Sequence, residues 1–224
     1  MTKIPLLLEA GADVNAMSHG SEQPLERAVF HDQPEVVRCL IEAGAQVTNM
    51  PRKQNLLHIA GRLARLEALK YLADMHPPLL NVHQEDDWGD TPWDEFIWAL
   101  HAPEWNLGAS RRPTPQEQDA FVTLYKKLRD RSLELDISRL QRIRQHLEDE
   151  IFHGTMTVLQ SLISEKRDWE QWDSVRTYET IKLQVRERMV EAALESVDEN
   201  TEVLQEKIEA SPWDQVSRWE ASET

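Results

Sequence analysis

The chain has 224 residues, a formal net charge of -15 at pH 7 and an apolar content of 40%, so it can bury a core in one elongated domain or two small ones. The negative charge argues against general binding to nucleic acids or anionic membranes, because both need a positive protein surface. No apolar run approaches the roughly 20 residues that span a bilayer, and the N-terminus lacks the pattern of a secretory signal.

Two short sequence patterns recur at nearly constant spacing. LLLEAGADVN at residues 6–15 returns within VVRCLIEAGAQV at residues 36–47, and the glycines of the two copies lie 33 residues apart. PLERA at residues 24–28 returns in altered form as LLHIA at residues 56–60, 32 residues later. A fixed period of this length, built on short helices, indicates a solenoid in which each repeat buries its apolar face against its neighbours.

These segments resemble the ankyrin repeat, whose unit is a β-turn followed by two antiparallel helices, the first beginning with Thr-Pro-Leu-His. Three segments are degraded versions of that beginning: QPLE at 23–26, NLLH at 55–58 and DTPW at 90–93. The resemblance covers roughly residues 1–100. It implies an all-α fold, an ankyrin-type helical solenoid with two clear repeats plus partial first and last units.

The first repeat is incomplete, because the chain begins near the start of what should be its second helix. The apolar side chains of residues 4–8 then have no preceding neighbour to cover them. Two explanations stay open: the array is truncated at its N-terminus within a longer protein, or another segment covers this end. The helices expected after it span, in chain order, 24–30, 34–43, 56–63, 66–75 and 92–100.

The repeated pattern ends near residue 100, and the composition of the sequence changes there. Residues 101–114, with two prolines and a glycine, are typical of a linker. The next residues, TPQE, have the features of a helix start, with a hydroxyl cap, proline at the first position and a glutamate placed for a capping box. Apolar residues recur at helical spacing through 115–199 without sustained heptads, so we expect a C-terminal helical bundle there. Residues 200–224 are predicted to be a polar acidic tail, partly disordered.

No motif of a common enzyme class occurs in the sequence: there is no GxxxxGK[ST] phosphate loop, no GxSxG elbow and no HExxH helix. His76 and His83 lie near a group of acidic residues, but the spacing matches neither a zinc site nor a calcium loop, and a solvated acidic turn explains it. We therefore predict no catalytic residues, no metal and no cofactor. Cys39 is the single cysteine and fits a reducing, intracellular compartment, cytoplasmic or nuclear.

Ankyrin proteins typically contact their partners with the turn tips and with the concave face of the first helices. The resemblance maps these places onto nine residues: Arg27, Phe30, His31, Arg52, Lys53, Arg62, Asp86, Trp88 and Asp90. It also implies two structural residues. His58 stands where the family uses a histidine to hydrogen-bond the backbone of a neighbouring turn, and Trp93 replaces the usual core leucine.

Four of the eight tryptophans lie in one short stretch, at positions 88, 93, 98 and 105. Two interpretations of this cluster stay open. It can be a hydrophobic lid that joins the repeats to the helical region, or an aromatic anchor for a partner, because exposed tryptophan is a typical interface hot spot. Trp88, at a turn tip, is the best candidate for an anchor.

The sequence as a whole favours a non-catalytic protein–protein interaction module, an ankyrin-type scaffold or adaptor that binds protein partners and neither nucleic acid nor membrane. An alternative is a regulatory or targeting C-terminal fragment of a larger multidomain protein whose effector domain lies upstream. An enzyme hidden in the helical region is a third hypothesis, but it would need polar side chains converging in a pocket. The sequence identifies neither the partner nor the oligomeric state.

Overall fold

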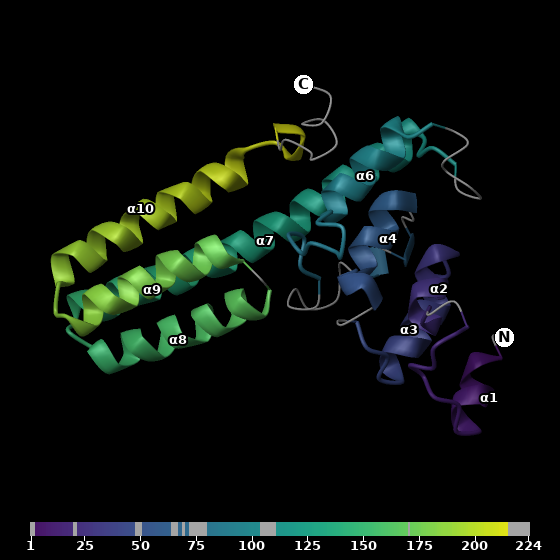
Figure 1. The fold of residues 1–224 in the computed structure, drawn as a ribbon, viewed down its shortest axis with the longest axis horizontal. Helices are drawn as coiled ribbons and strands as arrows, with labels where there is room; N and C mark the ends of the chain where they lie inside the picture. Colours follow the sequence, from purple (N-terminus) through teal and green to yellow (C-terminus); the bar gives the residue numbers. More distant parts are fainter. Residues whose placement is uncertain are drawn as a thin grey trace. The chain divides into compact units, whose positions relative to one another are not determined.

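The computed structural model describes residues 3–19, 22–47, 51–63, 67–68, 70–71, 80–103, 111–169 and 171–214 of the chain. All regular secondary structure in these ranges is helical (Figure 1), which confirms the predicted all-α class. The chain forms two compact units: unit 1 comprises residues 1–128 and 212–224, and unit 2 comprises residues 129–211. The division falls within one helix, α7 (Pro115–Glu148), whereas we predicted a change of domain at 101–114, most of which lies outside the described residues.

Unit 1 contains short helices, part of one long helix and two 3-10 turns. They are α1 (Ile4–Glu9), α2 (Pro24–Phe30), α3 (Pro34–Glu42), the 3-10 turn η1 (Pro51–Lys53), α4 (Leu56–Leu63), α6 (Pro92–His101), the first part of α7 and the 3-10 turn η4 (Pro212–Asp214). The predictions for α2, α3, α4 and α6 are confirmed to within one residue at each end. The helix predicted at 66–75 lies mostly outside the described residues.

Local sequence signals explain where these helices begin and end. Proline occupies the first turn of α2, α3 and α6, where its missing N–H costs no hydrogen bond. The recurrent Glu-Ala-Gly-Ala ends α1 and α3 in the same way. Gly44 has φ +88°, its N–H bonds the Ile41 carbonyl, and the Ala45 N–H bonds the Leu40 carbonyl; Gly11 ends α1 with the equivalent pair of bonds. Each copy is therefore a Schellman cap, which needs glycine at the left-handed position.

The helices of unit 1 form two layers. In one layer α2 packs against α4 and α4 packs against α6; in the other α1 packs against α3, and α2 and α3 contact each other. Figure 1 shows α1, α2, α3, α4 and α6 following one another in chain order through this unit. The helices of the first layer begin at residues 24, 56 and 92. Sequence spacing near one repeat thus corresponds to contact between neighbouring helices.

Hydrogen bonds between these helices and turns also follow the repeat. Those that join residues 31 to 36 positions apart include Gln46 N–H to Asn15 Oδ1 (2.8 Å), Gln54 Nε2 to Asp86 Oδ2 (3.1 Å), His58 Nε2 to Asp90 O (3.0 Å), Arg62 Nε to Glu95 Oε2 (2.8 Å) and Ala68 N–H to Asp32 Oδ1 (2.9 Å). Segments about one sequence period apart are therefore joined by polar contacts as well as by the apolar core.

The first part of α7 covers the α6 side of unit 1. Its predicted capping box is present, since the Glu117 carboxylate accepts from Thr114 N–H at 2.8 Å and the Glu117 N–H reaches Thr114 Oγ1 at 3.4 Å. The Arg111 guanidinium hydrogen-bonds the same carboxylate and lowers the pKa of Glu117 to about 2. Further along, Phe121 stacks on Phe96 of α6 with ring centroids 4.4 Å apart.

Unit 2 is a bundle built from the second part of α7, α8 (Phe152–Asp168), α9 (Trp172–Arg186) and α10 (Val190–Glu209). A shared core of aliphatic side chains and Tyr178 joins the four helices: Leu140, Ile143, Leu147, Leu159, Leu162, Ile163, Val175, Tyr178, Ile181, Val185, Ala193 and Val197. Residues 129–211 therefore form a helical bundle, whereas residues 115–128, predicted to belong to the same helical region, are part of unit 1.

One boundary in unit 2 is corrected. Helix α10 runs through Glu209, so the first ten residues of the predicted tail are helical. Leu204 packs against the core, and the buried Arg129 guanidinium donates to the carbonyl of Ala210 at 2.7 Å, where the helix ends. A cation at the carboxyl end of a helix satisfies free carbonyls and opposes the helix dipole. Residues 215–224 of the predicted tail lie outside the described residues.

Candidate functional site

Two turns of unit 1, at residues 51–54 and 85–90, contact each other through an arginine and a tryptophan. We call the two turns together the Arg52–Trp88 tip. Arg52 Cζ lies 5.4 Å from the centre of the Trp88 ring, and the Asp87 N–H donates to the Arg52 carbonyl at 3.0 Å. The Trp88 side chain is 51% exposed. A guanidinium stacked on a half-exposed indole is pre-ordered, and these are two of the residue types that dominate protein interfaces.

The same tip has an unusual backbone. Arg52 and Lys53 are consecutive non-glycine residues with positive φ, at 63° and 55°. Left-handed backbone costs roughly 1–2 kcal/mol for such residues, and strain of this kind occurs preferentially at functional sites. The Arg52–Trp88 tip therefore combines exposure, strain and a hot-spot pair.

Two acidic residues that were predicted as partner contacts, Asp86 and Asp90, are buried inside the Arg52–Trp88 tip. Asp86 Oδ1 accepts the N–H groups of Trp88 (2.9 Å) and Asp90 (3.0 Å), while its other oxygen accepts from Gln54. Asp86 and Asp90 are buried, with 5% and 7% of their surface exposed. We therefore assign both to the framework that holds Trp88 outward instead of to the contact surface.

Arg62 of α4 is held by the neighbouring helix α6. Its guanidinium makes two hydrogen bonds to the buried Glu95 carboxylate, one of them 2.8 Å long, and its Cζ lies 5.9 Å from the Trp98 ring. The hydrogen bonds to Glu95 raise the pKa of Arg62. Arg62 thus presents a fixed, half-exposed cation beside a half-buried indole.

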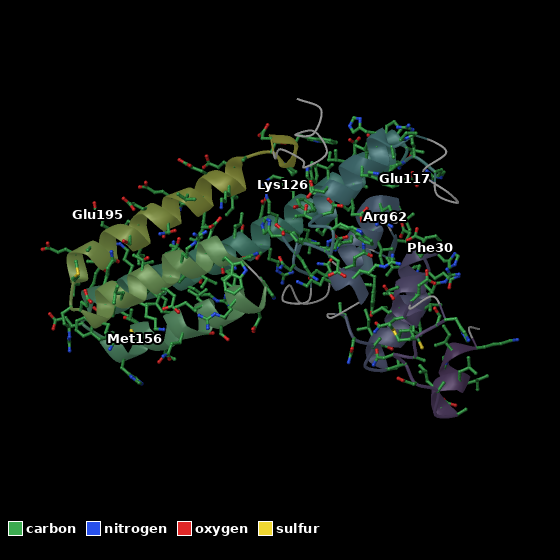
Figure 2. The ribbon with its side chains drawn as sticks, viewed as in Figure 1. Phe30, Arg62, Glu117, Lys126, Met156 and Glu195 are labelled. Carbon is green, nitrogen blue, oxygen red and sulfur yellow. The ribbon has the colours of Figure 1, made fainter. Side chains whose placement is uncertain are left out.

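Three more of the predicted partner contacts, Arg27, Phe30 and His31, lie together on α2 and at its end. Arg27 Cζ is 5.6 Å from the Phe30 ring, and the Phe30 ring meets the His31 ring edge-on at 5.1 Å. Arg27 also reaches Glu22 at 3.4 Å, with both side chains about half exposed. Figure 2 labels Phe30 on α2 and Arg62 on α4, two helices that pack against each other. Arginine over an aromatic ring is therefore a feature shared by three neighbouring parts of unit 1.

His58 lies at the centre of unit 1 and is fully buried. Its Nδ1 accepts the Asn55 N–H at 3.0 Å, so Nε2 carries the proton and donates to the Asp90 carbonyl at 3.0 Å. Burial lowers the pKa of His58 below its ordinary value of 6.5, because the charged form is poorly solvated there. The neutral ring is thereby fixed between one helix start and the next turn.

This arrangement predicts a specific pH dependence. Between its ordinary pKa and its lowered folded pKa, His58 binds a proton in the unfolded chain but not in the folded one. The stability contributed by His58 is therefore complete above about pH 6.5 and falls as the pH drops toward the folded pKa, by at most about 1.4 kcal/mol per pH unit.

Urea unfolding of the wild type and of the His58→Gln variant at about pH 7.5, 6.5 and 5.5 measures this effect, since the other titrating groups are common to both proteins. The variant should be less stable than the wild type at pH 7.5. The difference between their free energies of unfolding should become smaller as the pH falls. Parallel pH curves for the two proteins would show that His58 is not the neutral bridge described above.

Trp93 belongs to an aromatic cluster that the sequence predicted only in part. Trp93 is buried and its ring centroid lies 5.5 Å from Phe96, 5.1 Å from Tyr125 and 5.3 Å from Trp213. The sequence predicts that Trp213 lies in a polar acidic tail that is partly disordered, since nothing in its local sequence connects it to residues more than 100 positions earlier. Trp105, which was grouped with Trp93, lies outside the described residues.

No model of a known protein family matches this chain, and no curated protein matches it. Within the described ranges, no group of three or more His, Cys, Asp or Glu side chains is placed to hold a metal ion. Among the same residues, no helix is both long and apolar enough to cross a bilayer.

Proposed function

We propose that residues 1–100 form an ankyrin-type solenoid and that the protein is a non-catalytic module for binding other proteins. The observation that carries the proposal is the coincidence of sequence period and contact. Like helices stack on like helices about one repeat later, and hydrogen bonds join residues 31 to 36 positions apart. Solenoids of this kind present extended surfaces made of equivalent positions in successive repeats.

The partner-binding surface that we propose comprises Arg27, Phe30, His31, Arg52, Lys53, Arg62 and Trp88. Three arginines of this surface are ordered over aromatic rings, which reduces the conformational entropy lost on binding. The net charge of -15 favours a protein partner over nucleic acid. The single, half-buried thiol of Cys39 suits a protein of the cell interior.

The tip variant Arg52→Ala/Lys53→Ala/Trp88→Ala tests this surface. Removing a hot-spot tryptophan and its stacked arginine costs about 2 kcal/mol or more of binding free energy, which corresponds to a loss of affinity of roughly 30-fold. The melting temperature should change little, because these side chains are exposed. Affinity purification with mass spectrometry identifies proteins retained by the wild type, and titration calorimetry with a purified partner gives the loss.

A matched control uses the same residue types on exposed positions of unit 2: Trp172→Ala/Arg176→Ala/Lys207→Ala. This variant should bind the partner as the wild type does. Equal affinity of the tip variant and the control for every retained protein would remove the Arg52–Trp88 tip from the binding surface.

A further inference from the structure

The turn η4 places a tryptophan from the end of the described chain on the core of unit 1. Pro212 is buried, and the Trp213 ring meets Trp93 edge-on at 5.3 Å and Phe96 at 6.0 Å. The Trp213 side chain is nevertheless 51% exposed. We call residues 212–214 the clasp, since they lie on a surface made by residues far earlier in the chain.

The residues of that surface also contact one another directly. Trp93 and Phe96 of α6 pack against Phe121 and Tyr125 of α7, with Phe96 stacked on Phe121 at 4.4 Å and Trp93 against Tyr125 at 5.1 Å. The Tyr125 hydroxyl also donates to the Val82 carbonyl at 3.3 Å. We call Trp93, Phe96, Phe121 and Tyr125 the aromatic face; these contacts among α6, α7 and Val82 do not involve η4.

The aromatic face also holds an unsatisfied donor. Trp93 Nε1 is buried and has no hydrogen-bond acceptor among the described residues. A buried N–H without an acceptor is unfavourable, and such groups are rare in folded proteins. A ligand that brings a carbonyl oxygen to Trp93 Nε1 while filling the place of the Trp213 ring would gain a contact that the clasp does not supply.

We propose that the aromatic face is a peptide-binding site and that the clasp is its internal competitor. The ligand is a segment of a partner protein that carries an aromatic side chain next to proline, as the clasp does, and offers a backbone carbonyl to Trp93 Nε1. The half-exposed Trp213 is displaced when such a segment binds. This site is separate from the Arg52–Trp88 tip and does not depend on the function proposed for that tip.

The test is a peptide titration of the full-length chain, followed by the indole N–H signals in proton–nitrogen NMR spectra. The probe is a synthetic peptide of residues 209–216, EASPWDQV. The Trp213→Ala protein has an open site, so the peptide should shift the Trp93 signal saturably; a Trp93→Phe variant assigns that signal. In the wild type the clasp competes with the peptide. The peptide concentration at the midpoint of the titration should therefore be at least about tenfold higher than in Trp213→Ala, because apparent affinity scales with the fraction of open sites.

The control peptide carries alanine in place of the tryptophan and should leave the Trp93 signal unmoved. Equal midpoints for wild type and Trp213→Ala, or no saturable shift in the variant, would overturn the proposal. Loss of folding in both Trp213→Ala and the milder Trp213→Phe would also overturn it, because the clasp would then be a structural part of unit 1. Concentration-dependent dimers of the wild type that disappear in Trp213→Ala would identify a second copy of the chain as the occupant and would equally rule out the partner segment.

Discussion

Replacing Gly61 with alanine should destabilise unit 1 by about 3 kcal/mol, although alanine is the better helix former. A Cβ at Gly61 of α4 would lie 2.5 Å from the Pro92 carbonyl oxygen and 3.3 Å from Phe121 Cζ. Pro92 begins α6, so its carbonyl moves only if the helix moves with it. Overpacking against fixed backbone typically costs about 1–3 kcal/mol, and this contact is at the severe end.

Thermal unfolding distinguishes the two physical arguments, because helix propensity alone predicts a gain of about 1 kcal/mol. We expect the melting temperature of the Gly61→Ala variant to fall by about 10 °C. Gly154→Ala in α8 is the matched control. Its new Cβ would lie 2.9 Å from the His146 ring, a side chain that can rotate away, and we expect a change within about 1 kcal/mol. A Gly61→Ala protein that melts with the wild type would refute the close approach of α4 and α6.

Replacing Lys166 with methionine should destabilise unit 2 by about 3 kcal/mol at neutral pH. Lys166 Nζ lies 2.5 Å from Asp136 Oδ2, and the two side chains are 3% and 6% exposed. The variant leaves the Asp136 carboxylate buried without its nearest cation, an arrangement that costs about 3–5 kcal/mol. Arg139, 3.4 Å from the other Asp136 oxygen, keeps the expected loss near the lower figure.

Lowering the pH should reduce the stability loss caused by Lys166→Met. Burial raises the pKa of Asp136, and removing Lys166 takes away the main interaction that opposes the effect. In the variant the folded state therefore binds a proton more tightly than the unfolded state, so stability is gained as the pH falls through the raised pKa. Urea unfolding at about pH 7.5 and 5.5 should show a smaller difference from the wild type at the lower pH.

Lys182→Met is the control for the Lys166 prediction. Lys182 pairs with Glu179 at 3.3 Å on the partly exposed surface of α9, where ion pairs contribute about 0–1 kcal/mol. A loss for Lys166→Met no larger than that of the control would show that Asp136 does not depend on its buried partner.

The helices of unit 1 were predictable because proline and glycine mark their ends. Pro24 and Pro92 begin helices, and the Glu-Ala-Gly-Ala motifs stop α1 and α3, through interactions within a few residues. Whether a polar side chain is exposed is harder to predict, since burial depends on segments distant in the sequence. Asp86 looks like a solvated charge in sequence, yet it is enclosed by Gln54 and by the N–H groups of its own turn.

Contacts between distant segments account for the remaining differences between the predicted and the observed structure. The sequence predicts a polar acidic, partly disordered tail from residue 200, but α10 continues to Glu209 and Arg129 satisfies its last carbonyls from about 80 positions away in the chain. The position of Trp213 likewise depends on Trp93 and Phe96. Propensity and hydrophobic period describe neighbours in sequence, so they carry no information about either contact.

The discontinuous make-up of unit 1 has a consequence for biosynthesis. Domains generally fold in the order in which the ribosome releases them, but Trp213 emerges only after all of residues 129–211 have been translated. For the whole of that interval a nascent chain lacks the ring that packs on Trp93 and Phe96 in the folded protein.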